Sequence, residues 1–254
     1  MTLSAFIFDV DGTLADTERD GHRVAFNLAF AEAGLDWHWD VDLYGALLAV
    51  TGGKERMRHY LDRYRPDWVH PADLDSLIVQ LHADKTRHYT QLLAQGGIPL
   101  RPGVARLLNQ ARAAGVRLAI ATTTTPENVT VLLEHALSQQ AVSWFEVIAA
   151  GDVVPAKKPA PDIYQYTLAR LGLAPDACLA FEDSENGLRA ARGAGLRTVI
   201  TVNDYTRDQD FTDAVLVLDQ FGEPQQPFRV LGSRAPLHGA HLFDLPLAQA
   251  LIGG

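Results

Sequence analysis

The chain has 254 residues, of which 47% are hydrophobic, and a formal net charge of −9. This length allows one large globular domain or two smaller ones. The acidic balance argues against nucleic-acid and membrane-surface partners, because both require a basic face. The single cysteine excludes a disulfide framework and fits a reducing compartment. The first residues lack the features of a signal peptide, and no apolar run approaches the roughly 20 residues that span a bilayer. We expect a soluble, cytoplasmic protein that acts as a monomer.

The first predicted element is a buried strand, AFIF at residues 5–8, which leads into DVDGT at residues 9–13. Two carboxylates, Asp9 and Asp11, therefore lie at the end of a core strand. Each costs several kcal/mol to remove from water unless it is paired. By itself the pattern is more often a turn or a helix cap than a functional site. Its interpretation depends on what the rest of the chain brings to the same place.

Residues 16–96 have the spacing of helices and contain no convincing strand. Apolar residues repeat at i, i+3, i+4 and i+7 in residues 57–64 and again in residues 74–81. The second pattern continues through Lys85 to residue 92, which predicts that Lys85 points inward. We interpret this segment as an all-helical cap domain that is inserted just after the first strand.

Beyond about residue 100, strand-like and helix-like segments alternate. The predicted strands are residues 116–121, 145–149, 178–181 and 197–202, and the predicted helices are residues 102–114, 126–137, 161–171 and 184–194. The segment after Gly222 has the composition of a loop, and residues 243–252 fit either a short helix or a short strand. The alternation predicts an α/β fold, a Rossmann-like core of residues 1–15 and 97–254 with a parallel sheet. Functional groups are expected at the carboxyl ends of its strands.

Polar side chains follow several of these strands. Thr122 follows the strand at 116–121, Lys158 lies in the loop after residue 149, and Glu182 and Asp183 follow the strand at 178–181. They are expected to converge with the two aspartates at 9 and 11. Carboxylates repel by about 4 kcal/mol per pair at about 4 Å and an effective dielectric near 20, so the cluster requires a lysine and a bound cation. Oxygen ligands favour Mg²⁺, and a cation, a lysine and a hydroxyl together describe a phosphate site.

Four of these segments resemble the motifs of the haloacid dehalogenase superfamily of phosphatases. The segments are DVDGT at 9–13, the threonine after LAIA, KKPAPD at 157–162 and FEDSENG at 181–187. They occur in the family's order and cover roughly residues 1–15 and 97–205, and the helical insertion resembles the family's cap. The forms of the third and fourth motifs resemble the subgroup that contains beta-phosphoglucomutase and the CbbY-like sugar-phosphate phosphatases.

The resemblance implies that Asp9 is a nucleophile that forms an aspartyl-phosphate. Asp11 is then the acid that protonates the leaving sugar oxygen and the base that later takes a proton from water. It must be neutral for the first step, and we expect the neighbouring carboxylates to raise its pKa. Mg²⁺ would bind the Asp9 carboxylate, the backbone carbonyl of Asp11 and the Asp183 carboxylate, with Glu182 as a further ligand or as a neighbour of the ligands.

The same resemblance assigns the phosphoryl oxygens to Thr122 and Lys158, and Lys158 would also offset the charge of Asp9. The adjacent Lys157 is expected to be solvated, because it is Lys158 that directly precedes the proline, as in the family motif.

The cap is expected to select the substrate. The candidate substrate-binding residues are Glu18, His22, Thr51, Gly52, Gly53, Lys54 and Lys85 of the cap and Thr122, Thr123, Thr124 and Lys158 of the core. The turn at 51–54 precedes a helix whose N-terminus can bind an anion, and two cap lysines suit a second phosphate. The CbbY-like resemblance, which is associated with carbon fixation, implies a ketose bisphosphate such as xylulose 1,5-bisphosphate. An ordinary helix–helix turn and a lysine at the rim of the site are the alternative.

Four other functions are compatible with parts of the pattern. A beta-phosphoglucomutase-like transferase would use the same two aspartates, although Thr13 is more typical of the phosphatases. A phosphatase of another small phosphorylated metabolite would use the same core. A haloalkanoic acid dehalogenase would lack the second carboxylate that Asp11 supplies, and a catalytically silent binding protein would have lost a motif. A Mg²⁺-dependent sugar-phosphate phosphatase fits all four motifs.

Overall fold

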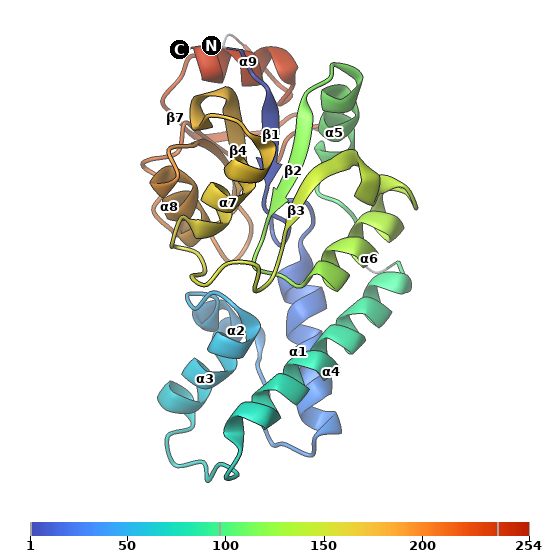
Figure 1. The fold of residues 1–254 in the computed structure, drawn as a ribbon, viewed down its shortest axis with the longest axis vertical. Helices are drawn as coiled ribbons and strands as arrows, with labels where there is room; N and C mark the ends of the chain where they lie inside the picture. The colour runs from blue at the N-terminus through green and yellow to red at the C-terminus, as the bar shows by residue number, and fades with distance from the viewer. Residues whose placement is uncertain (1, 97, 238, 254) are drawn as a thin grey trace.

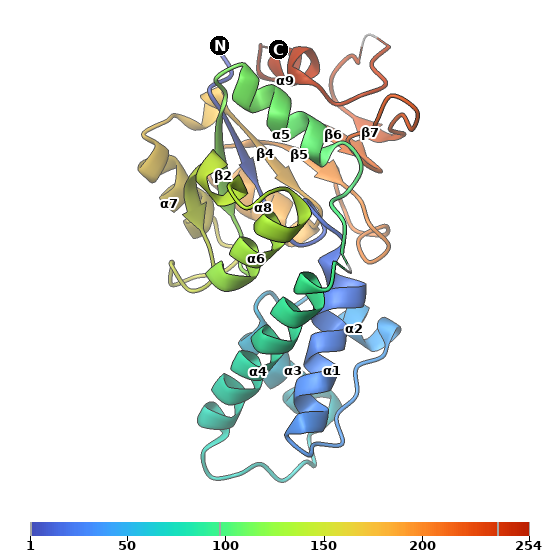
Figure 2. The same ribbon diagram turned by 90° about the vertical axis from the view of Figure 1, so that its right-hand side faces the viewer.

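The computed structural model describes residues 2–96, 98–237 and 239–253. It has two parts along its long axis (Figures 1 and 2): a sheet flanked by helices, near whose outer end both termini lie, and a group of helices, α1 to α4, at the other end. The predicted limits at residues 1, 97 and 254 lie outside the described residues. Within those residues, no helix combines the length and the hydropathy that a membrane span requires.

The sheet has seven strands in the order β3-β2-β1-β4-β5-β6-β7. They are β1 (Ala5–Phe8), β2 (Arg117–Ala121), β3 (Phe145–Ala149), β4 (Cys178–Glu182), β5 (Arg197–Thr201), β6 (Leu216–Leu218) and β7 (Val230–Ser233). The strands β1 to β6 run parallel, as predicted, and β7 pairs with β6 in the antiparallel direction. The prediction of a loop after Gly222 is wrong at β7. This edge strand is mostly exposed, so its sequence lacks the apolar run of a buried strand.

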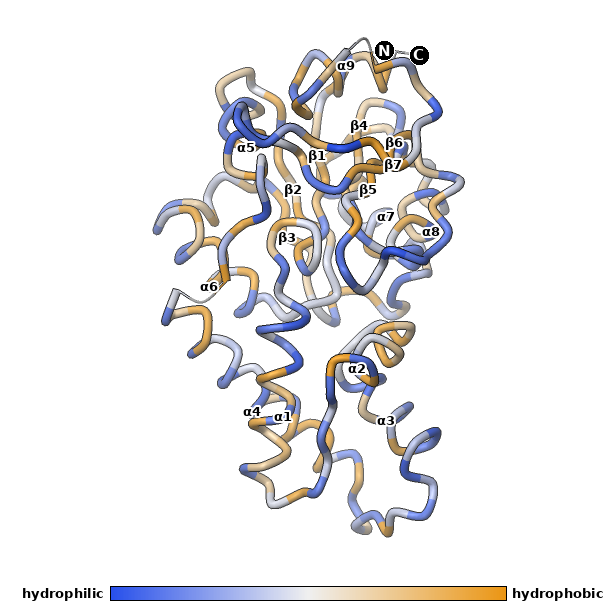
Figure 3. The backbone as a smooth tube through the Cα atoms, turned by 180° about the vertical axis from the view of Figure 1, so that it is seen from behind, coloured by the Kyte–Doolittle hydropathy of each residue, from blue (hydrophilic) through white to orange (hydrophobic). Residues whose placement is uncertain are grey.

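The helices of this part are α5 (Val104–Ala113), α6 (Pro126–Ala136), α7 (Asp162–Leu171), α8 (Glu185–Gly193) and α9 (Leu245–Gly253). Successive side chains of β1 point to opposite faces of the sheet, and they show which helices cover each face. Phe6 and Phe8 pack in one cluster with α5, α6 and α9, whereas Ala5 and Ile7 pack in another with α7 and α8. Hydrophobic and hydrophilic stretches alternate along the helices in Figure 3, as expected for helices with one buried face. Of the two predictions for residues 243–252, the helix is correct.

The second part is all helical, as predicted. It begins with a π-helical turn at Glu18–His22 and continues with α1 (Arg23–Glu32), α2 (Val41–Leu47), α3 (Gly53–Tyr64) and α4 (Leu74–Ala94). An aromatic cluster that includes Phe26, Trp39 and Tyr60 forms its core. Tyr64, which the periodicity places on the buried face, is 43% exposed because it is the last residue of α3. Two chain segments connect this insertion to the sheet, one before it and one after it, and we call them the crossings. They lie side by side, since Ala15 pairs with Leu100.

Candidate active site

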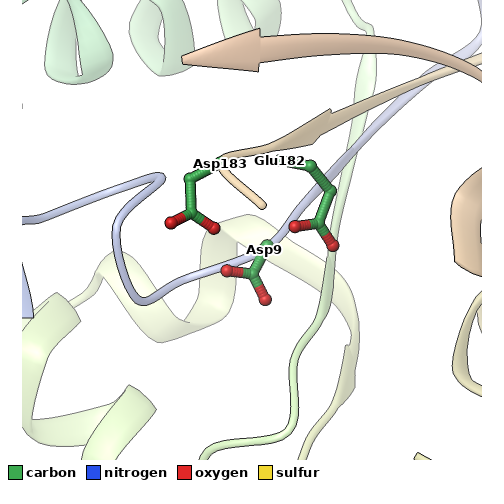
Figure 4. Close-up of side chains that lie close together, drawn as sticks. All are labelled: Asp9, Glu182 and Asp183. Atoms are coloured by element: carbon green, nitrogen blue, oxygen red, sulfur yellow. The ribbon is translucent and has the colours of Figure 1, made fainter. Parts of the chain in front are cut away.

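Three buried carboxylates meet where β1 and β4 end (Figure 4). The strands are adjacent and in register, with Phe8 opposite Phe181, so Asp9 lies beside Glu182 and Asp183. One carboxylate oxygen from each residue lies within 4.8 Å of the others. The predicted convergence of these strand ends is therefore observed.

Lys158 supplies the positive charge of this cluster. Its buried Nζ donates to Asp9 Oδ1 at 2.6 Å, to Glu182 Oε1 at 2.5 Å and to the carbonyl of Ala121 at 3.0 Å. Burial lowers the pKa of Lys158, but the charges of Asp9 and Glu182 and their hydrogen bonds raise it above its ordinary value, so the ammonium stays charged.

One ammonium does not neutralise three carboxylates. Burial, together with the charges of Glu182 and Asp11, raises the pKa of Asp9 to about 8 despite the nearby lysine. Burial and the charges of Asp9 and Glu182 likewise raise the pKa of Asp183 well above its usual range. The cluster therefore lacks positive charge, which is the condition under which a cation binds.

The residues present fit Mg²⁺. All the side-chain donors are carboxylate oxygens, the ligands that this ion prefers. Gly12 has a φ of +81°, and a Cβ there would collide with the Asp183 carboxylate, so only glycine lets the Asp11–Gly12 backbone approach so closely. Glu182 is less free than the two aspartates, because its Oε1 accepts hydrogen bonds from both Lys158 and the Tyr164 hydroxyl. Asp9 and Asp183 are thus the better-placed ligands.

The Asp11 carboxylate faces the helical insertion. Its Oδ1 accepts a hydrogen bond from Thr17 Oγ1 at 2.5 Å and lies 2.8 Å from His22 Nε2. Burial raises the pKa of Asp11, but the charge of His22 and the hydrogen bonds from His22 and Thr17, with a contribution from Lys85, together bring it below its ordinary value. The expectation of a raised pKa for Asp11 is wrong, because its nearest partners are the Thr17 hydroxyl and the His22 imidazole of the insertion.

Thr122 is buried at the end of β2 and lines, with Thr123, a cavity of about 90 Å³ that also contains Asp9, Lys158 and Asp183. Thr124 points elsewhere: its hydroxyl accepts a hydrogen bond from Asn128 Nδ2 at 3.1 Å, and it lines a neighbouring cavity. Of the three core threonines among the candidates, Thr122 therefore lines the first cavity, Thr124 lines the second, and Thr123 lines both.

The neighbouring cavity lies between the sheet and the insertion. It has a volume of about 40 Å³ and is lined by Asp11, Glu18, His22, Gly52, Gly53, Arg56, Lys85 and Thr124, among others. Lys85 is buried with its Nζ 5.3 Å and 5.0 Å from the ring centres of Phe26 and Tyr89, and burial lowers its pKa to about 8. The inward direction predicted for Lys85 is correct.

Two residues of this region were not among the candidates. Tyr44 donates a hydrogen bond to Glu18 Oε2 at 2.5 Å and accepts one from Arg56 Nη1 at 2.9 Å, and Arg56 Nη1 lies 4.0 Å from the same Glu18 oxygen. Arg56 precedes Tyr60 by four positions on the buried face of α3, and a charged residue on an apolar face is the signal that would have identified it. Tyr44 gives no such signal, because a buried tyrosine reads as ordinary core.

The residues of the glycine-rich turn at 51–54 also line different cavities. Thr51 lines the carboxylate cavity and accepts a hydrogen bond from Asn186 Nδ2 at 3.3 Å, whereas Lys54 lines neither that cavity nor the neighbouring one. Its Nζ lies 2.6 Å from Asp152 Oδ2 of the sheet domain, beside a third cavity of about 440 Å³. The structure thus separates Lys54 from the other candidates of the turn.

Lys157 forms an ion pair with Asp152 as well. Its Nζ lies 2.7 Å from Asp152 Oδ1 and 3.7 Å from Glu55 Oε1, and its side chain is only 16% exposed. The expectation of a solvated Lys157 is wrong, because the insertion covers it. Lys54, Glu55, Asp152 and Lys157 form a group of ion pairs across the boundary between the helical insertion and the sheet.

Residues 3–195 match the haloacid dehalogenase-like hydrolase family. The chain belongs to this family of enzymes, as its strand-end motifs predicted. The plasmid protein CbbY of Cupriavidus necator is 51% identical to it over 225 residues, which cover 89% of this chain and 88% of that protein. CbbY of Rhodobacter capsulatus is 53% identical over 214 residues, covering 84% of this chain and 92% of that protein.

Solved structures agree with this assignment. A crystal structure of CbbY from Rhodobacter sphaeroides with phosphate superposes with a TM-score of 0.82 at 48% identity, and a second, of a mutant in complex with xylulose-(1,5)bisphosphate, does so with 0.82 at 47%. Each match covers 87% of this chain and 96% of that one. The beta-phosphoglucomutase of Clostridium difficile, at 22% identity, a TM-score of 0.70 and coverage of 86% and 92%, shares the fold alone. The predicted class, a phosphatase of the haloacid dehalogenase type, is confirmed.

Proposed function

We propose that this enzyme is a Mg²⁺-dependent sugar-phosphate phosphatase whose substrate is a ketose bisphosphate such as xylulose 1,5-bisphosphate. The observation that carries the proposal is the buried set of Asp9, Lys158 and Asp183 beside a second cavity that holds the cations Lys85 and Arg56. The relatives named CbbY, one of them crystallised with that sugar bisphosphate, support the choice of substrate.

In the proposed reaction, an Asp9 carboxylate oxygen attacks phosphorus as the bond from phosphorus to the sugar oxygen breaks. The leaving oxygen takes a proton from Asp11. Water then attacks the aspartyl-phosphate and gives a proton to Asp11, which releases inorganic phosphate and restores the Asp9 carboxylate. Bound Mg²⁺ would be held by Asp9, Asp183 and the Asp11 carbonyl, and it would supply positive charge for the phosphoryl oxygens. Lys158 and Thr122 would hold the same oxygens.

Asp11 needs opposite protonation states in the two steps. Its contacts with His22 and Thr17 favour the carboxylate, which suits the removal of a proton from water. A phosphate dianion that enters beside Asp11 favours the protonated form. The first step therefore requires that Asp11 take up a proton when the substrate binds.

We propose that residues 16–96 act as the cap that selects the substrate. A second phosphate is best matched by Lys85 and Arg56, because both are buried and line the cavity next to Asp11. Lys54 would contribute only after it leaves Asp152, since in this structure it lies in the ion-pair group instead.

The test is release of inorganic phosphate from sugar mono- and bisphosphates with Mg²⁺, for the wild-type chain and for Asp9→Asn. We expect release from the bisphosphate by the wild type and none by the variant, with an unchanged circular dichroism spectrum. An isomeric sugar phosphate without free phosphate, observed by ³¹P NMR, would show a phosphomutase instead. Substantial turnover by Asp9→Asn would exclude Asp9 as the nucleophile.

A further inference from the structure

Arg101 is a buried arginine that lies close to the carboxylate cluster but outside every candidate set. Its Nη1 donates to the carbonyls of Gly12 and Thr201, the latter at 3.0 Å. Its Nη2 donates to the carbonyls of Val202 and Asp219, each at 2.7 Å. A guanidinium has five donors in a rigid planar fork, so this one side chain holds four carbonyls of three backbone segments at set distances.

Two of these segments build the cation site. Gly12 packs directly against the Asp183 carboxylate, so the position of the Gly12 backbone sets the space that is left for this side chain. Val202 precedes Asn203, whose Nδ2 donates to Asp183 Oδ2 at 2.7 Å. Arg101 therefore binds the backbone of both the Asp11–Gly12 loop and the loop that orients Asp183.

Arg101 also ties the same loops to the two crossings between sheet and insertion. Its backbone N–H donates to the carbonyl of Leu14 at 2.9 Å, in the first crossing. Leu100, directly before it, pairs with Ala15 and belongs to the second crossing. The nearest carboxylate, Asp16, is 3.6 Å from its Nε and 66% exposed, so the guanidinium acts mainly on backbone carbonyls.

We propose that Arg101 is a positioning residue for the divalent cation: it fixes the Asp11–Gly12 backbone and Asp183 at the spacing that a small ion requires. The inference rests on the proposed function, because it assumes that this cluster binds Mg²⁺. Mg²⁺ demands near-ideal octahedral geometry with short ligand distances. Loss of a residue that orients the ligands typically weakens metal binding by about 10- to 100-fold.

Arg106 is a matched control. Its Nη2 donates to the carbonyls of Phe221, Gly222 and Phe243 at 3.1, 2.8 and 3.1 Å. It thus joins backbone segments in the same way, but none of its partners belongs to the cation site. Arg106→Met is expected to cost stability without weakening the binding of a metal ion.

The experiment measures the dissociation constant of Mn²⁺ for the metal-free protein from the electron paramagnetic resonance signal of the free ion. We expect Arg101→Met to raise this constant by about 10- to 100-fold, Arg106→Met to change it by less than about twofold, and Arg101→Lys to fall between. Arg101→Lys keeps the buried charge, so it can replace Arg101→Met if that variant does not fold. It still tests the inference, because an ammonium cannot span the four carbonyls that the guanidinium binds.

Two results would overturn the inference alone: a folded Arg101 variant with the wild-type constant, or an equal loss of affinity in Arg106→Met. Absence of Mn²⁺ binding by the wild-type protein would instead overturn the metal dependence of the proposed function, and the inference with it.

Discussion

Replacement of Lys85 by methionine is expected to stabilise the folded protein in the absence of substrate. Lys85 is 5% exposed, and none of the described carboxylates forms an ion pair with it. Methionine keeps the aliphatic packing against Phe26 and Tyr89 and removes the buried charge.

The magnitude follows from the proton affinity of Lys85. Burial lowers its pKa from 10.5 to about 8. A tenfold change in proton affinity corresponds to about 1.4 kcal/mol, so at pH 7 the buried charge costs the folded state about 3 kcal/mol relative to the unfolded chain. For a protein of this size, that corresponds to a rise of about 6 to 12 °C in Tm for Lys85→Met.

The sign of the pH dependence can be checked. Between pH 8 and 10.5 the unfolded chain keeps a proton on Lys85 that the folded chain has released, so the wild type gains stability as the pH rises. The advantage of Lys85→Met is therefore largest below pH 8, and it falls to about half or less at about pH 9.5. Urea denaturation of both proteins at the two pH values measures this difference.

Lys54→Met is the control, since Lys54 forms an exposed ion pair and its loss costs about 1 kcal/mol or less. The reasoning about Lys85 would be refuted if Lys85→Met were no more stable than the wild type at pH 7, or if its advantage did not change with pH. If Lys85 binds the second phosphate, the stabilised variant also has a higher KM for a sugar bisphosphate. A residue whose removal stabilises the fold and weakens the activity is kept for function.

Three further predictions concern the charges of the site. Lys158→Met leaves buried carboxylates without their ammonium and is expected to lower the free energy of unfolding by about 3 to 5 kcal/mol. The control is Lys157→Met, at the neighbouring position in the chain, which is expected to cost about 1 kcal/mol. Equal losses of stability in thermal denaturation would contradict this prediction. Lys54→Ala is expected to raise KM for a bisphosphate far more than for an aryl phosphate if Lys54 leaves Asp152 for the substrate, and equal effects would exclude that role. Burial raises the pKa of Asp9 from 3.8 to about 8, so the metal-free protein loses stability as the pH rises between these values, and Mg²⁺ raises Tm more at pH 8 than at pH 5. A rise in Tm that is the same at both pH values would argue against binding to this cluster.

Local sequence was sufficient for the core of the site. A buried strand is identified by its apolar run and its end by the first polar residue, and parallel strands side by side must present their ends together. Asp9, Thr122 and Asp183 could therefore be predicted to converge, and they do. Helical periodicity likewise predicted that Lys85 points inward, because the direction of a side chain along a helix follows from its position alone.

The partners of the charged groups could not be predicted in this way. Asp11 meets His22 and Thr17 only because a π-helical turn brings the insertion back over the end of β1. Lys54 meets Asp152 because the insertion rests on the loop after β3, the loop that also carries Lys157.

The sequence by itself thus determined the strands β1 to β5, the all-helical insertion and the residues at the strand ends, since these depend on period and local order. Only the tertiary structure decided that Asp11 contacts Thr17 and His22, that Lys54 lies outside the candidate cavities and that Arg101 binds the backbone of the cation site. A pKa or an ion pair depends on charges within a few ångströms, whatever their separation in the chain, and those distances are set when the insertion docks on the sheet.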